Sequence, residues 1–204
     1  MTTRGNPTTA SLRVASAGTA SDGVDAASQT RAADRTWGIL RIVLGSVFLW
    51  AFLDKAFGLG FSTGRDPVTG AVDRFGAAAW IHGGSPTAGF LGHGLHTTAA
   101  LTDFYASLAG HAWVDWAFML SMLLVGLGLM AGVMVRLAVV GGVAWMAMMY
   151  SAASIWPANH PVVDDHVIYA IALVGLALAN SGTVYGLGRQ WQRLGFVQRH
   201  ALLR

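Results

Sequence analysis

Three long apolar runs occupy the second half of the chain. They are Trp116–Val135, Leu137–Trp156 and Val167–Leu187. Each is close to the roughly 20 residues that a helix needs to cross the hydrocarbon core of a bilayer. Only 11% of the residues are charged, whereas a soluble domain has about 25% charged residues. The sequence therefore predicts an integral membrane protein whose surroundings are the lipid bilayer.

A fourth apolar run, Ile39–Leu53, precedes these three and is interrupted near its start by Arg41. With this run included, we expect an all-α fold built as a bundle of four transmembrane helices. The spans are predicted at about residues 36–57, 115–135, 137–156 and 165–186. They form a single membrane domain over residues 35–190.

The two ends of the chain are predicted to lie outside the bundle. Residues 1–34 are almost free of large apolar side chains, so we expect a disordered tail, and residues 191–204 form a second, basic tail. Arginine is concentrated in both tails and at Arg136, in the tight link between the second and third spans. The positive-inside rule then places both termini in the cytoplasm of a multi-pass plasma-membrane protein. The net charge of +3 follows from this topology, and no nucleic-acid partner is expected.

The loop from about residue 58 to residue 114 is too long to be a simple connection between two helices. Gly83-Gly84-Ser85-Pro86 and Gly92-His93-Gly94 interrupt it, and short amphipathic pieces containing Trp80, Phe90 and Phe104 lie around these interruptions. Such pieces suit the membrane interface. We expect a partly helical extracytoplasmic lid over the outer mouth of the bundle.

Several kinds of cofactor site have no basis in the sequence. The chain has no Cys, which excludes thiolate nucleophiles, disulfides and cysteine-bound iron–sulfur clusters. No His lies in the middle of a predicted span, which argues against a bis-His haem between helices. No haem, iron–sulfur centre or metal site is therefore expected, although His93 and His96 leave a metal site as a weaker alternative.

The first span carries two basic residues on one helical stripe. Arg41, Gly45, Phe48, Phe52 and Lys55 follow each other at offsets of 4, 3, 4 and 3 residues. Both cations are costly in lipid unless they snorkel, are solvated or are paired. Snorkelling accounts for Arg41, but Lys55 is the only lysine of the chain and follows Asp54 where the span meets the long loop. Lys55 is therefore a candidate functional residue.

A second polar constellation, Asp164-Asp165-His166-x2-Tyr169, lies at the outer end of the fourth predicted span. One of the two Asp residues is expected to cap the helix N-terminus. His titrates near working pH, so the remaining groups could relay protons and could pair with Lys55 across the bundle. The candidate catalytic residues are Lys55, Asp165 and His166, and the candidate substrate- or quinone-binding residues are Arg41, Asp54, Asp164 and Tyr169.

Three stretches of the chain resemble the DoxX/DoxD family of small membrane proteins. They are Arg41-x3-Gly45-x2-Phe48-Leu49-x5-Lys55; Gly83-Gly84-Ser85-Pro86-Thr87-x2-Phe90-Leu91 with Trp113-x2-Trp116-x-Phe118; and Asp164-Asp165-His166-x2-Tyr169-Ala170 with Gly186-Leu187-Gly188-Arg189-x-Trp191. Together they cover about residues 36–191. The resemblance implies a four-helix membrane bundle linked to respiratory redox chemistry.

The resemblance implies a membrane subunit of a quinone-linked oxidoreductase of the thiosulfate dehydrogenase type, with quinone as the electron acceptor. Lys55 and Arg41 would bind quinone oxygens or an anionic substrate, and His166 and Asp165 would handle protons. No side chain here is a redox centre, so electrons would pass directly from substrate to quinone or through a second redox subunit. The main alternative is a non-catalytic membrane partner that recruits a soluble redox or oxidative-stress enzyme. A small-solute transporter is a less favoured alternative.

Overall fold

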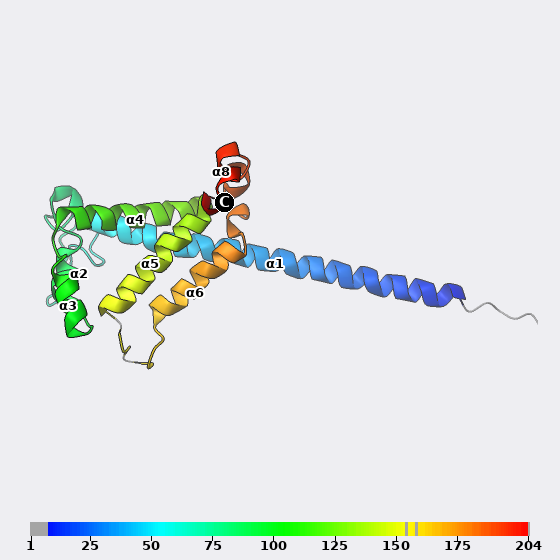
Figure 1. Cartoon of the computed structure of the whole chain (residues 1–204), viewed down its shortest axis with the longest axis horizontal. Helices are drawn as coiled ribbons and strands as arrows, with labels where there is room; N and C mark the ends of the chain where they lie inside the picture. Colours follow the sequence, from blue (N-terminus) through cyan, green and yellow to red (C-terminus); the bar gives the residue numbers. More distant parts are fainter. Residues whose placement is uncertain (1–7, 154, 158, 204) are drawn as a thin grey trace, which may run out of the picture.

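The computed structural model describes residues 8–153, 155–157 and 159–203, and of residues 8–24, 93 and 99 it describes the backbone alone. The helices are α1 (Thr8–Phe57), η1 (Trp80–His82), α2 (Ala88–His93), α3 (Ala99–Ala106), α4 (Ala112–Ala131), α5 (Val135–Ala153), α6 (Asp165–Leu178), η2 (Ser181–Thr183), α7 (Gly188–Trp191), α8 (Gly195–Arg199) and η3 (Ala201–Leu203). In these residues no β-strand forms, and an isolated bridge joins Arg65 to Val72. The prediction of an all-α fold is confirmed (Figure 1).

In the described part of the chain, three helices are long and apolar enough to cross a membrane. They are the Asp25–Phe57 part of α1, α4 and α5. The sequence-based prediction of a membrane protein is confirmed at this level. The fourth apolar helix, α6, has 14 residues, and a helix of that length extends about 21 Å, less than the roughly 30 Å of a hydrocarbon core.

The predicted fourth span, residues 165–186, is a shorter helix than expected. The backbone leaves α6 at Ala179, and Asn180 adopts the left-handed conformation with φ of 48°, which asparagine tolerates better than most residues. The following residues pack against the turn between α4 and α5. A Cβ atom on Gly182 would lie 2.6 Å from the carbonyl oxygen of Gly132, so only glycine allows this approach.

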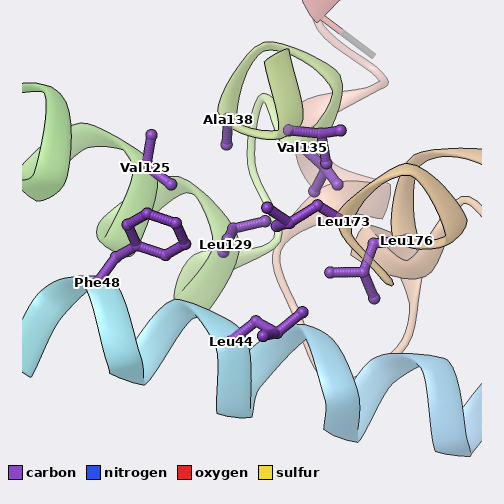
Figure 2. Packing of buried hydrophobic residues seen from close by; sticks show 9 residues of the cluster. Leu44, Phe48, Val125, Leu129, Val135, Ala138, Leu173 and Leu176 are labelled. Atoms are coloured by element: carbon purple, nitrogen blue, oxygen red, sulfur yellow. The ribbon is translucent and has the colours of Figure 1, made fainter. Parts of the chain in front are cut away.

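The four apolar helices share one core. Phe48 of α1, Leu129 of α4 and Leu173 of α6 point toward one another at its centre, with residues of α5 beside them (Figure 2). Glycine brings α1 and α4 close together: a Cβ atom on Gly126 would lie 2.8 Å from the backbone nitrogen of Leu49. Small residues at such crossings let helix backbones pack closely in lipid.

Both ends of the chain contain helices in the described residues. Helix α1 begins at Thr8 and projects beyond the bundle, and the side chains of residues 25–36 are exposed (Figure 1). This segment is rich in alanine and free of proline, so it continues the helix of the span. At the other end, residues 191–203 fold back: Val197 is fully buried, and Arg136 donates to the carbonyl oxygen of Ala201 at 2.9 Å. Residues 1–7 lie outside the described part of the chain.

The segment that connects α1 to α4, residues 58–111, is held at the opposite end of the bundle from the C-terminus (Figure 1). Its helices α2 and α3 pack on α5 through a small cluster of Leu91, Tyr105 and Ala152. Two hydrogen bonds link this segment to α5, from His96 N to the Ala152 oxygen at 3.1 Å and between Tyr105 Oη and Ser151 Oγ at 2.6 Å. The connecting segment is therefore tied to the bundle by packing and by polar contacts.

Candidate functional site

One cavity of about 670 Å³ opens between the connecting segment and the bundle. Residues from α1, α4, α5 and α6 form its walls, together with residues 62–65 and 84–90 of the connecting segment. Four of the seven candidate residues line it: Lys55, Asp165, His166 and Tyr169. The structure thus brings the lone lysine of α1 and the polar start of α6 to the same cavity.

Lys55 enters this cavity from the last turn of α1. Its Nζ atom donates to Ser62 Oγ at 3.2 Å and lies 5.9 Å from the centroid of the Phe118 ring. That second distance is within the range of a cation–π contact. Lys55 forms no ion pair within 4 Å of a carboxylate in the part of the chain that the structure describes. The direct pairing with the α6 carboxylates is therefore not formed, although both groups face one cavity.

Asp54 has a different role from its neighbour. Its carboxylate is 2% exposed, and its oxygens accept from the backbone nitrogens of residues 61, 62 and 63 at 3.0, 2.9 and 3.0 Å, and from Ser62 Oγ at 2.7 Å. These four bonds fold the chain that leaves α1 into a tight loop. Because Ser62 Oγ gives its proton to Asp54, its lone pairs face Lys55 Nζ. Asp54 therefore positions Lys55 through Ser62 and does not line the cavity itself.

The start of α6 supplies the opposite wall. Asp164 caps the helix by accepting from Val167 N at 3.2 Å, which confirms the prediction that one of the two Asp residues is the cap. His166 Nδ1 lies 2.6 Å from an oxygen of Asp164 and 3.5 Å from an oxygen of Asp165. A carboxylate on Nδ1 fixes the orientation of the imidazole ring. Asp164 thus orients His166, while His166, Asp165 and Tyr169 line the cavity.

Among the described residues, one group of side chains is close enough together to act as metal ligands. Ligand atoms of Asp164, Asp165 and His166 lie within 4.8 Å of one another, which is close enough for one cation. The cap and the Asp164–His166 contact account for this closeness without a metal. The weaker prediction of a metal site at His93 and His96 falls partly outside the described part of the structure, because only the backbone of His93 is described.

Arg41 does not line this cavity, which reaches along α1 as far as Leu44, and it is completely buried. Its guanidinium donates to the carbonyl oxygens of Leu129, Met130, Val184 and Tyr185. Glycine makes room for it, since a Cβ atom on Gly132 or Gly186 would lie 2.9 Å from a guanidinium nitrogen. Arg41 therefore joins the end of α4 to the segment after α6, and it neither snorkels nor lines the cavity.

Aromatic rings form much of the remaining wall. Phe118 of α4 and Trp145 of α5 meet edge to face with their centroids 4.6 Å apart, and the indole of Trp145 donates to Ser121 Oγ at 2.7 Å. Phe48 and Phe90 line the same cavity. An aromatic wall with a few polar groups is typical of sites for flat, largely apolar ligands.

Asp115 was not among the candidate residues, although it anchors part of the cavity wall. Its carboxylate is 6% exposed and accepts from Ser85 Oγ at 3.0 Å, Thr87 Oγ1 at 2.6 Å and Thr87 N at 3.1 Å. These bonds fix residues 84–90 against α4. The sequence offered two signals: an acid in the first turn of a membrane helix and, much earlier in the chain, the Ser-Pro-Thr sequence at residues 85–87.

Comparisons with known proteins add no relative: no family model, no curated protein and no solved structure matches this chain.

Proposed function

We propose that the protein is the membrane subunit of a quinone-linked oxidoreductase, with the quinone ring bound in the cavity between the connecting segment and the bundle. The observation that carries this proposal is the convergence of Lys55, Asp165, His166 and Tyr169 on one cavity with an aromatic wall. A quinone is a flat, largely apolar ring with polar oxygens, and its reduction consumes two electrons and two protons. The cavity offers an apolar wall for the ring and polar groups for the oxygens.

Each polar residue has a role in this proposal. The ammonium group of Lys55 donates to a quinone oxygen and stabilises the negative charge that develops there during reduction. His166, held by Asp164, and the neighbouring Asp165 deliver protons, with Tyr169 as a further donor. The resemblance to the DoxX/DoxD family suggests thiosulfate as the electron source. Since no side chain is a redox centre, the substrate or a second redox subunit passes electrons to the bound ring.

The membrane arrangement is part of the proposal. We place α6 and the residues that follow it as the fourth crossing, with both termini in the cytoplasm of the plasma membrane. Residues 58–111 then form the extracytoplasmic lid above the cavity. This topology is supported by the arginine residues at both ends of the chain and at Arg136.

A second function, a non-catalytic partner that recruits a soluble redox enzyme, is favoured by one observation. Helix α1 extends beyond the bundle, and residues 25–36 are exposed on all of its faces (Figure 1). An exposed helix that projects beyond the bundle presents its surface to another protein. In this function, the bundle would serve as an anchor.

Quinone reduction by the purified protein in nanodiscs separates the two functions. With thiosulfate as donor, the first function predicts reduction of a short-chain quinone, which Lys55→Met abolishes while leaving the protein folded. Trimming the chain before residue 25 should leave this activity intact, because α1 projects beyond the bundle at this end and even residues 25–36 are exposed (Figure 1). Absence of reduction both with and without copurifying chains would contradict the first function.

A further inference from the structure

A second, smaller cavity of about 330 Å³ adjoins the main one. It lies between the helices of the connecting segment and α4 and α5, and its walls include Leu91, Leu108, Val114 and Met148. The two cavities share four lining residues: Pro86, Phe90, Phe118 and Trp145. Because the same four side chains form part of the wall of both, the smaller cavity lies directly beside the proposed site, and we call it the side chamber.

The wall between the two cavities is held in place. The rings of Phe118 and Trp145 are in edge-to-face contact, and Ser121 fixes the indole nitrogen of Trp145. Aromatic pairs of this kind add to packing beyond the area that they bury. A ligand that occupies both cavities must therefore pass beside the rings of Phe118 and Trp145. A ligand with its ring in one cavity and its flexible chain in the other can do so.

The two cavities differ in the polar groups that they offer. Lys55, Arg65, Asp165 and His166 line the main cavity, whereas none of the described residues that line the side chamber is charged. The polar side chains of its wall are already engaged within the protein. Thr87 Oγ1 donates to Asp115, Tyr105 Oη is paired with Ser151, and Ser121 Oγ donates to the Phe118 oxygen at 2.9 Å.

A chamber with such a wall excludes polar occupants. A polar group placed there would lose its bonds to water and find no partner in exchange. Cavities lined by apolar groups stay dry and accept hydrocarbon. The occupant that fits is a flexible hydrocarbon chain.

We infer that the side chamber is a binding subsite for the hydrocarbon chain of an amphiphilic ligand whose polar ring occupies the main cavity. This inference rests on the proposed quinone site and narrows its substrate to chain-bearing quinones. An isoprenoid and an acyl chain share the chemistry that the chamber accepts. The side chamber binds the hydrocarbon chain, and the polar residues of the main cavity bind the polar ring.

Two adjacent methionines of α5 provide a matched pair for the test. Met148 lines the side chamber alone, and Met149 lines the main cavity alone. Both are half-buried, and both can be replaced by phenylalanine. Met148→Phe should fill the chamber, and Met149→Phe should crowd the ring site, with a similar cost in packing for each variant.

The experiment measures equilibrium binding to the full-length protein in detergent of a benzoquinone without a side chain and of the same ring with a ten-carbon chain. Met148→Phe should weaken binding of the chain-bearing quinone about tenfold and leave the chainless one unchanged. Met149→Phe should weaken binding of both. Each ligand partitions into the micelle to the same extent with all three proteins. The ratio of dissociation constants between a variant and the unaltered protein therefore measures the effect of the substitution on binding.

The outcomes separate this inference from the proposed function. If both quinones bind and Met148→Phe affects them equally, the chain subsite is wrong and the ring site stands. If neither quinone binds the unaltered protein, both the ring site and its chain subsite are wrong. Decanoate distinguishes the source of the chain. If decanoate displaces the chain-bearing quinone from the unaltered protein but not from Met148→Phe, the chamber is a subsite for hydrocarbon chains in general. Failure of decanoate to bind supports a subsite for a chain attached to the ring.

Discussion

Arg41 and Lys55 lie on the same stripe of α1, yet their surroundings are opposite. Arg41 is sealed in the protein and donates to four backbone carbonyl oxygens. Lys55 has one hydroxyl partner and faces a cavity. A buried cation that donates to backbone carbonyl oxygens of two other segments stabilises the fold, whereas a cation with remaining donors beside a cavity is available to a ligand. The two ends of one helix therefore separate stability from binding.

The largest effect is expected at Arg41. Arg41→Ala removes a buried guanidinium that donates to four carbonyl oxygens, and we expect the free energy of unfolding to fall by about 3 kcal/mol or more. Thermal unfolding in detergent measures it. Arg136→Ala is the control, because Arg136 is exposed and makes one bond to the Ala201 oxygen. Equal stability of the two variants would show that the Arg41 contacts are not what joins α4 to the segment after α6.

The space around Arg41 gives the next largest effect. A Cβ atom on Gly186 would lie 2.9 Å from an Arg41 nitrogen and from the Ala131 and Gly182 oxygens, so Gly186→Ala should lower the unfolding free energy by about 2 kcal/mol. At Gly195 a Cβ atom meets nothing within 4 Å. Gly195→Ala should change stability by less than about 0.5 kcal/mol in the same assay. If Gly186→Ala leaves the unfolding free energy unchanged, the Arg41 guanidinium is not tightly packed against Gly186.

A smaller and more local effect is expected at Asp54. Both carboxylate oxygens of Asp54 accept hydrogen bonds, and Asp54→Asn replaces one of them with an NH₂ group that cannot accept. We expect the free energy of unfolding to fall by about 1–2 kcal/mol. Hydrogen exchange of residues 61–63 should accelerate. Asp66→Asn is the matched control, since exposed Asp66 accepts from the backbone of Val68 and Thr69. Its exchange should change at residues 68–69 alone, and unchanged exchange at 61–63 in Asp54→Asn would refute the positioning role.

The smallest effect on stability is expected at Lys55, where the effect on binding is the largest. Lys55→Met removes one hydrogen bond at the edge of a cavity, so the unfolding free energy should change by less than about 1 kcal/mol. Binding of a quinone should weaken about tenfold or more, as for loss of a charged hydrogen bond. Both quantities are measured on the same sample by thermal shift and by titration. A large loss of stability with retained binding would reverse the roles assigned to Arg41 and Lys55.

The apolar spans were predictable because they depend on local composition. The predicted second and third spans begin and end within a few residues of α4 and α5, and the cap at Asp164 followed from residue type and position. The end of α6 was missed because it depends on the close approach of Gly182 to Gly132, a contact between distant parts of the chain. Low hydrophobicity predicted a tail outside the bundle, and it carries no information on the helix that α1 forms there, which alanine favours.

The candidate site was predictable to a lesser extent. A lone lysine and an acidic, histidine-containing helix start are conspicuous beside apolar spans, and these were found. The roles of Arg41, Asp54 and Asp115 were not found, because each of these side chains bonds to backbone groups or hydroxyls that the sequence does not mark. A buried polar side chain reveals its role through its partners, and most of these partners come from other helices or from the loop.

The central claim is that Lys55 faces a ligand in the main cavity, and the chain offers a direct measurement. Lys55 is the only lysine, so reductive ¹³C-methylation labels it and the terminal amine alone. In NMR spectra of the labelled protein in detergent micelles, addition of a chain-bearing quinone should shift the Lys55 methyl resonance with saturation, while the terminal amine resonance stays unchanged. A Lys55 resonance that stays fixed while the quinone binds, or that shifts only in step with the terminal amine, would contradict the account.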